Sequence, residues 1–145
     1  MKIRLSKEFS FEMAHALKDY DGKCRHIHGH SFKLVVTVIG EPIEDDKSPK
    51  NGMVIDYGDL KKIVNKLIVD QYDHALVLPE KSELIAKLED TDLHTIILPF
   101  QPTSEKMLEH FAKMLQKELP KSLKLFSLKL HETATSFAEW FAEDN

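Results

Sequence analysis

The stretch that decides the fold is His28-Gly29-His30-Ser31-Phe32-Lys33-Leu34-Val35-Val36-Thr37-Val38-Ile39. Its alternate positions are His28, His30, Phe32, Leu34, Val36 and Val38. Because side chains two residues apart in a β-strand project to the same face, this pattern predicts a strand whose apolar face begins with two histidines. The upstream stretch from Ile3 to His15 alternates in the same way, with Phe9, Phe11, Met13 and His15 at one parity. The two stretches predict an antiparallel pair joined by a histidine-rich junction from Lys18 to Gly29.

Two segments have the periodicity of amphipathic helices. The first follows Asp56, a predicted N-cap, and ends near Tyr72-Asp73-His74. Its apolar stripe is Leu60, Ile63, Val64, Leu67 and Ile68. The second helix follows Pro102, with Thr103 or Ser104 as its cap, and ends at Pro120. The intervening residues 79–100 predict an excursion with a short helix (Ser82 to Leu88) and a short strand (Thr95 to Leu98).

The remaining segments complete an α+β plan. Alternation over Leu123 to Glu132 and over Ser136 to Phe141 predicts two more strands. The order β-β-α-α-β-β predicts a single domain over residues 1–145, with a four-stranded antiparallel sheet and two helices on one face. Such a sheet has two exposed edges, which proteins usually pair or cover, so we expect a homo-oligomer formed through the sheet.

Composition narrows the class of partner. The chain has 145 residues and a net charge of -4, which argues against nucleic acid as the main partner. No run approaches the roughly 18 apolar residues of a membrane span, and the N-terminus lacks the apolar core of a secretory signal. Cys24 is the only cysteine, so no internal disulfide can form. We therefore expect a cytoplasmic protein with a free thiol.

The histidines predict a metal site. His28 and His30 share one side of a strand, and His15 ends the neighbouring strand on its apolar face. Three histidines leave one coordination position open, the pattern of a catalytic zinc site. An H-x-H pair alone is a weak motif, and His26 shares the parity of His28 and His30. The trio of residues 26, 28 and 30 is therefore an alternative ligand set.

Three further residues are candidates for chemistry. Cys24 is flanked by Lys23, Arg25 and His26, and positive neighbours favour a reactive thiolate, although lone cysteines are most often buried and inert. In Asp73-His74 a carboxylate could orient an imidazole for acid-base catalysis, but on spacing alone a solvated turn explains the pair better.

Glu132 ends the parity set of Phe126, Leu128 and Leu130 in the predicted strand from Leu123 to Glu132. A carboxylate at the rim of an apolar face can accept paired N–H donors from a flat heterocycle. The alternative is a strand-end residue in water.

The chain resembles the 6-pyruvoyl-tetrahydropterin synthase and 6-carboxytetrahydropterin synthase family over nearly its whole length. The matching blocks are Phe11-Glu12-Met13-Ala14-His15, Cys24-Arg25-His26-Ile27-His28-Gly29-His30-Ser31-Phe32, Met53-Val54-Ile55-Asp56-Tyr57, Tyr72-Asp73-His74, Pro102-Thr103-Ser104-Glu105 and His131-Glu132-Thr133-Ala134-Thr135-Ser136. A cysteine four residues before H-G-H, with an upstream A-H, is the most specific of these.

The resemblance implies a role for each motif. His15, His28 and His30 resemble the zinc ligands, and the family pattern gives His26 no role. Cys24 resembles the catalytic thiol, with Asp73 and His74 as its acid-base partners. Glu132 resembles the residue that anchors the pterin ring, and the pocket lining corresponds to Thr103, Ser104 and Glu105. The resemblance also implies a trimer whose sheets close into a barrel. Two such trimers would stack into a hexamer, with active sites between subunits.

The implied substrate is 7,8-dihydroneopterin triphosphate. The chain is more similar to the carboxy branch, in which zinc-dependent cleavage yields 6-carboxy-5,6,7,8-tetrahydropterin, acetaldehyde and triphosphate for queuosine and 7-deazaguanine synthesis. The alternatives are the pyruvoyl branch, which eliminates triphosphate for the tetrahydrobiopterin pathway, and a non-catalytic zinc- or pterin-binding oligomer. The chain departs from the family pattern at Ala75-Leu76-Val77-Leu78, where many members carry D-H-x-x-L-N, and in the longer excursion to Phe100.

Overall fold

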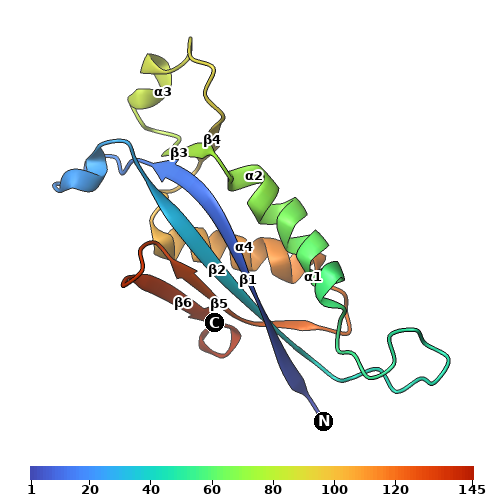
Figure 1. Cartoon of the computed structure of the whole chain (residues 1–145). Helices are drawn as coiled ribbons and strands as arrows, with labels where there is room; N and C mark the ends of the chain where they lie inside the picture. Colours follow the sequence, from blue (N-terminus) through green and yellow to red (C-terminus); the bar gives the residue numbers. More distant parts are fainter.

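A curled sheet of six strands forms the centre of the molecule (Figure 1). The structure, a computed structural model, describes residues 1–145. The strands are β1 (Ile3–His15), β2 (His28–Gly40), β3 (Ala75–Pro79), β4 (Thr95–Leu98), β5 (Lys124–His131) and β6 (Phe137–Phe141), in the sheet order β4-β3-β1-β2-β5-β6. Strands β1, β2, β5 and β6 are antiparallel neighbours, whereas β3 lies parallel to β1 and β4 lies parallel to β3.

The prediction of a four-stranded antiparallel sheet is therefore wrong in detail, although the α+β class is right. The four predicted main strands are present, but β3 and β4 add a parallel edge. Strand β4 lies where a short strand was predicted, and β3 was missed. All five residues of β3 are buried, so the segment has no alternation of polar and apolar residues. A short apolar run of this kind carries no periodicity that separates a strand from a buried connection.

The helices begin at the residues that the sequence predicts. The side chain of Asp56 accepts a hydrogen bond of 2.6 Å from the Gly58 N–H at the start of α1 (Tyr57–Val64). This helix continues through a π-helical turn, η2 (Asn65–Val69), into α2 (Asp70–Tyr72). Thr103 caps α4 (Ser104–Glu118). The short elements are η1 (Lys23–Arg25), α3 (Leu84–Lys87) and η3 (Ala142–Asp144).

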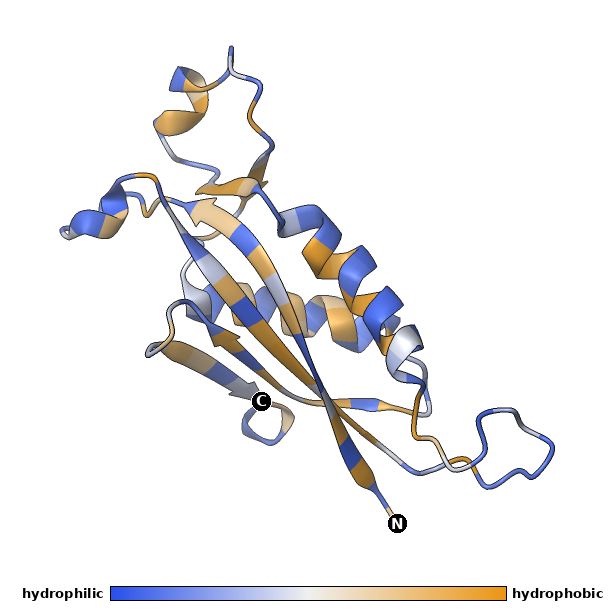
Figure 2. Cartoon of the chain, in the orientation of Figure 1, coloured by the Kyte–Doolittle hydropathy of each residue, from blue (hydrophilic) through white to orange (hydrophobic).

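The core lies between one face of the sheet and the two long helical segments. The alternating apolar residues of β1 and β2 pack against α1, η2 and α4, and Figure 2 shows the matching orange stripes. Phe11 pairs with Phe32 across the two strands, with ring centroids 5.6 Å apart, and Phe111 of α4 meets Phe11 edge-on at 6.4 Å. The predicted placement of both helices on one face is confirmed.

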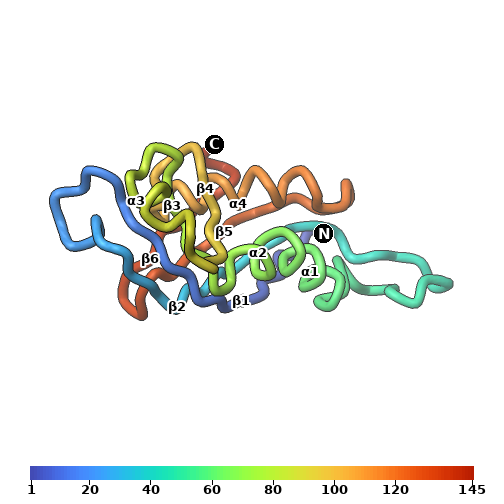
Figure 3. Tube along the Cα trace, turned by 90° about the horizontal axis from the view of Figure 1, so that it is seen from above, coloured from blue at the N-terminus to red at the C-terminus, as the bar shows by residue number.

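Two loops project at opposite ends of this layered body, one between β1 and β2 and the other between β2 and α1 (Figures 1 and 3). The first contains η1 and Cys24. It lies at the end of the sheet where β1 stops and β2 starts. It is therefore close to His15, the last residue of β1, and to His28, the first residue of β2. None of the helices has the length and apolar character needed to cross a membrane.

Candidate metal centre and adjoining pockets

Three histidines meet where β1 ends and β2 begins. His15 and His28 are direct partners in the antiparallel register, and His30 is two residues further along β2 on the same face. One ligand atom from each of His15, His28 and His30 lies within 4.8 Å of the others. His26 is exposed and does not join this cluster, so the alternative trio of residues 26, 28 and 30 is not formed.

The hydrogen bonds of two of these rings define their tautomers. His15 Nδ1 and His28 Nδ1 each lie 2.7 Å from a carbonyl oxygen, of Pro102 and His26 respectively. A carbonyl only accepts, so each Nδ1 carries the hydrogen and each neutral ring has its lone pair on Nε2. These two Nε2 atoms are 3.1 Å apart. Two lone pairs at this distance repel unless a cation lies between them.

The third ring supports the same conclusion. His30 Nε2 is buried and has no hydrogen-bond partner, and an orphaned buried polar atom needs an explanation. Burial of His15 lowers the pKa of its imidazole, which keeps that ring neutral. Three clustered imidazoles, two of which have their other nitrogen oriented by a carbonyl group, are the ligand chemistry of zinc. The residues therefore fit a divalent metal of this type.

A pocket of about 340 Å³ opens beside the histidines. It is called the Cys24 pocket here, and its polar lining is His15, Tyr20, Cys24, Thr103, Ser104, Glu105, Glu132 and Ser136. Cys24 lies in η1, and its carbonyl accepts a hydrogen bond of 2.9 Å from the Leu17 N–H. The structure thus brings Cys24 and all four predicted substrate-binding residues into the pocket that His15 also lines.

Glu132 follows the last residue of β5 and faces the histidines. Its Oε2 accepts a hydrogen bond of 2.7 Å from the Ser104 hydroxyl, and its Oε1 lies 3.6 Å from His30 Nε2. The Glu132 side chain is 27% exposed. A partly buried carboxylate with one oxygen oriented by a hydroxyl is suited to accept N–H donors from a polar ring.

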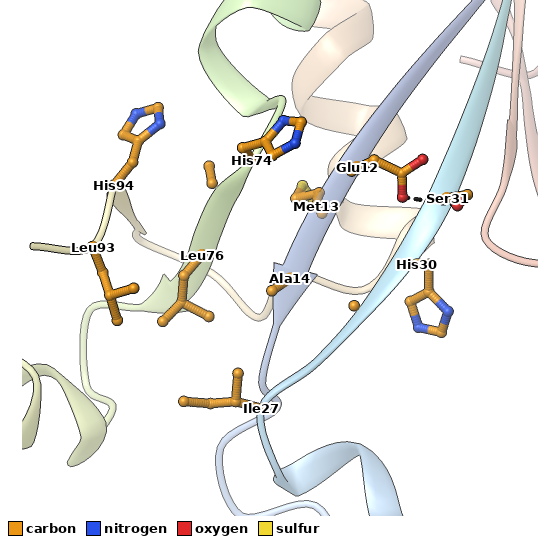
Figure 4. A pocket seen from close by; sticks show the side chains of 12 residues that line it. Glu12, Met13, Ala14, Ile27, His30, Ser31, His74, Leu76, Leu93 and His94 are labelled. Atoms are coloured by element: carbon orange, nitrogen blue, oxygen red, sulfur yellow. Dashed lines mark hydrogen bonds between the residues drawn. The ribbon is translucent and has the colours of Figure 1, made fainter.

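Asp73 and His74 do not line the Cys24 pocket. His74 lines a second pocket of about 440 Å³, here called the His74 pocket, with Glu12, Ser31, Leu76 and His94 among its lining residues (Figure 4). Glu12 and Ser31 alternate with the core residues of their strands, so they project from the opposite face of the sheet. No hydrogen bond or ion pair joins Cys24 to Asp73 or His74 within one chain.

Sequence reasoning missed some contributors to the site. Tyr20 and Phe137 line the mouth of the Cys24 pocket and are about half exposed, 46% and 48% respectively. An aromatic residue in a polar loop near a cysteine is a signal that could have pointed to Tyr20. The carbonyl groups of Pro102 and His26 orient two histidines, but a main-chain group leaves no signature in the sequence.

Comparisons with known proteins identify the family to which the sequence is similar. The family model described as 6-pyruvoyl tetrahydropterin synthase matches residues 4–143. A protein of Haemophilus influenzae named 6-carboxy-5,6,7,8-tetrahydropterin synthase is 38% identical over 142 residues, covering 95% of this chain and 98% of its own. A protein of Synechocystis with the same name is 34% identical over 137 residues, covering 94% and 91%.

Solved structures share the fold. An uncharacterized protein of Wolinella succinogenes superposes with a TM-score of 0.80 at 20% identity, covering 98% of this chain and 99% of its own. The 6-pyruvoyl tetrahydropterin synthase of Plasmodium falciparum superposes with a TM-score of 0.71 at 24% identity, covering 96% of each chain.

Proposed function

Because this chain belongs to the 6-pyruvoyl tetrahydropterin synthase family, we propose that it is a zinc-dependent lyase acting on 7,8-dihydroneopterin triphosphate. With water, the proposed reaction yields 6-carboxy-5,6,7,8-tetrahydropterin, acetaldehyde and triphosphate, and supplies queuosine and 7-deazaguanine synthesis. The carboxy branch is favoured over the pyruvoyl branch because relatives at 30–38% identity carry the carboxy name. A cytoplasmic setting is part of the proposal, since Cys24 must remain a free thiol.

The single observation that carries the proposal is the convergence of three imidazoles beside a carboxylate-lined pocket. The facing Nε2 atoms of His15 and His28 and the unpartnered Nε2 of His30 define one point for a cation. Zinc bound there supplies Lewis-acid polarisation of the substrate's side-chain hydroxyls. His15 also lines the Cys24 pocket, where a small heterocyclic substrate would have room.

Different protein residues carry out substrate binding and proton transfer in this proposal. Glu132, with its Oε2 held by Ser104, accepts N–H donors from the pterin ring and so fixes its orientation. Thr103, Ser104 and Glu105 line the wall against which the ring would lie. Cys24, as thiolate, takes a proton from the substrate side chain beside the histidines.

Asp73 and His74 complete the proton transfer from a neighbouring subunit in this proposal. Within one chain they open onto the His74 pocket rather than onto Cys24. Strand β6 also leaves one edge of the sheet unpaired, which favours assembly through the sheet. A trimer or hexamer in which the His74 pocket of one subunit faces the Cys24 pocket of the next would unite the three groups.

The test is product identification. Zinc-loaded protein is incubated with 7,8-dihydroneopterin triphosphate, the pterin is identified by mass spectrometry, and acetaldehyde is measured with alcohol dehydrogenase and NADH. Stoichiometric acetaldehyde and a 6-carboxy pterin support the proposal. Triphosphate release without acetaldehyde would assign the pyruvoyl branch, and binding without turnover would assign a non-catalytic pterin-binding oligomer.

A further inference from the structure

The side chain of Gln101 makes a two-bond contact with the backbone of Lys18. The Lys18 N–H donates to Gln101 Oε1 over 2.9 Å, and Gln101 Nε2 donates to the Lys18 carbonyl over 2.5 Å. A primary amide is the one side-chain group that carries a strong donor and a strong acceptor side by side without charge. Both polar groups of one main-chain residue are thereby satisfied by a side chain 83 positions away.

On one side of this contact is the loop that carries Cys24. The Leu17 N–H donates to the Cys24 carbonyl over 2.9 Å, which closes the loop on itself. Immediately after Lys18, the backbone of Asp19 adopts a left-handed conformation with φ 57°, where the chain reverses. The Gln101 contact is therefore made at the point where the loop leaves the sheet and turns.

On the other side is the segment from Gln101 to Ser104. The carbonyl of Pro102 accepts the hydrogen bond from His15 Nδ1, and the hydroxyl of Ser104 donates to Glu132. A rigid link to this segment places the loop relative to both the histidine cluster and the carboxylate. The geometry is that of one amide joining two halves of the Cys24 pocket.

The loop has no other hydrogen bond of this kind. The remaining bonds of residues 17–27 are local: Arg25 N–H to the Gly22 carbonyl, His26 N–H to the Lys23 carbonyl, an ion pair between neighbouring Lys18 and Asp19, and the bond from His28 to the His26 carbonyl. The two bonds from Gln101 are the only ones that tie the loop to a distant part of the chain. Without them, the loop would have no hydrogen bond to the segment from Gln101 to Ser104.

We infer that Gln101 is a positioning residue that holds the Cys24 loop against the segment from Pro102 to Ser104. It acts through Lys18 and belongs neither to the histidine cluster nor to the lining of the Cys24 pocket. Its effect on turnover rests on the proposed function, whereas its effect on the loop does not. The nitrogen and oxygen of its side chain are both required, so no residue without an amide can replace it.

Gln101→Met removes both bonds at nearly constant side-chain size, and Gln116→Met on the exposed face of α4 is the matched control. Amide hydrogen exchange is followed by NMR in the full-length protein. The Lys18 amide loses its partner, so its exchange accelerates in any case. The informative amide is Leu17, whose partner is the unchanged Cys24 carbonyl. We expect its exchange, and alkylation of Cys24 by iodoacetamide, to accelerate by about tenfold.

Leu17 protection and Cys24 alkylation at parental rates in Gln101→Met would overturn the inference. If that variant does not fold, Gln101→Glu replaces it, because a carboxylate keeps the acceptor for Lys18 N–H but sets an oxygen against the Lys18 carbonyl. The expected acceleration in Gln101→Glu is the same in direction, and unchanged rates there would also overturn the inference.

Turnover distinguishes a positioning role from a purely structural role, because a purely structural role would leave kcat unchanged. If the proposed reaction is established, Gln101→Met should lower kcat by about tenfold, with KM and zinc content close to parental values, because the thiol is misplaced while the ligands are not. An unchanged kcat would contradict a positioning role. If the parent protein shows no turnover, the proposed function fails while exchange and alkylation still decide the role of Gln101.

Discussion

The Nδ1 atom of His74 lies 3.1 Å from the Oδ1 atom of Asp73, although the two residues are adjacent in sequence. The two residues form the turn between α2 and β3, and the contact depends on the backbone of that turn. His74 has a φ of 62°, in the left-handed region, which turns its ring back onto the carboxylate. The turn is anchored to β1, because the His74 N–H donates to the Glu12 carbonyl over 2.6 Å.

The same anchor acts on the carboxylate. The Glu12 N–H donates to Asp73 Oδ1 over 2.8 Å, and this hydrogen bond is the main cause of the lowered pKa of Asp73. Asp73 is thus held as a charged partner that can orient the His74 ring. In the proposed function this pair is an acid-base unit whose thiol partner belongs to another chain.

Subunit mixing tests this arrangement. Cys24→Ala and His74→Ala should each abolish turnover as pure oligomers. Refolding the two variants together should restore part of the activity, because some sites then combine an intact Cys24 from one subunit with an intact His74 from the next. The measurement is acetaldehyde release from an equimolar mixture. No recovery in oligomers proved to be mixed by mass spectrometry would mean that each site is contained in one chain.

Replacing His15 should remove the metal. His15→Ala deletes one of three ligand atoms and the bond to Pro102, so we expect zinc content to fall from about one per chain to near zero after dialysis. His26→Ala is the control, since only its main-chain carbonyl contacts His28, and it should keep its zinc. Elemental analysis of both variants decides the point. Loss of metal from the His26 variant alone would overturn the ligand assignment.

Cys24→Ala should separate chemistry from metal binding. The thiol lines the pocket but is not among the three clustered ligands, so zinc content and thermal unfolding should be unchanged. Loss of a proton-transfer group typically costs about 10²–10⁴-fold in rate. Single-turnover kinetics with zinc-loaded variant and parent measure the loss. A parental rate would make Cys24 a structural residue, and loss of zinc would make it a ligand.

Glu132→Gln should weaken substrate binding without altering the metal. The amide keeps the size of the side chain, but it offers one acceptor and brings an unwanted donor. Leaving ring donors unpaired should cost about 1–3 kcal/mol of binding free energy. Calorimetry with a product analogue compares the affinity of this variant with that of the parent and of Glu118→Gln, a control at an exposed position of α4. Parental affinity in the Glu132 variant would show that the ring is anchored elsewhere, with Glu105 the next candidate.

Alkaline stability should depend on Tyr72. Burial raises the pKa of Tyr72 to about 12, whereas the phenol of an unfolded chain ionises near pH 10. Between these values the folded state retains a proton that the unfolded state releases, so stability falls as pH rises. We expect the parent to lose about 1 kcal/mol more than Tyr72→Phe between pH 9 and pH 11. Urea unfolding at both pH values measures the difference, and equal losses would refute the assignment.

The sequence by itself determined the elements whose pattern is periodic. Alternation in β1 and β2 placed His15, His28 and His30 on one face, because the period of a strand assigns every side chain to a side. Helical spacing and capping residues located α1 and α4 in the same way. These patterns are local, so they can be recognised in a segment without knowledge of the rest of the chain. The family motifs added the candidate roles of Cys24, Asp73, His74 and Glu132.

Only the tertiary structure decided how distant segments meet. The parallel addition of β3 and β4 depends on main-chain pairing, which leaves no side-chain pattern in a fully buried strand. The separation of Cys24 from His74 into two pockets depends on which face of the sheet each loop reaches. The contact of Gln101 with Lys18 joins one side chain to one backbone unit across 83 positions. Hydrogen bonds to the main chain are indifferent to the identity of the residue that offers them, so no sequence pattern encodes them.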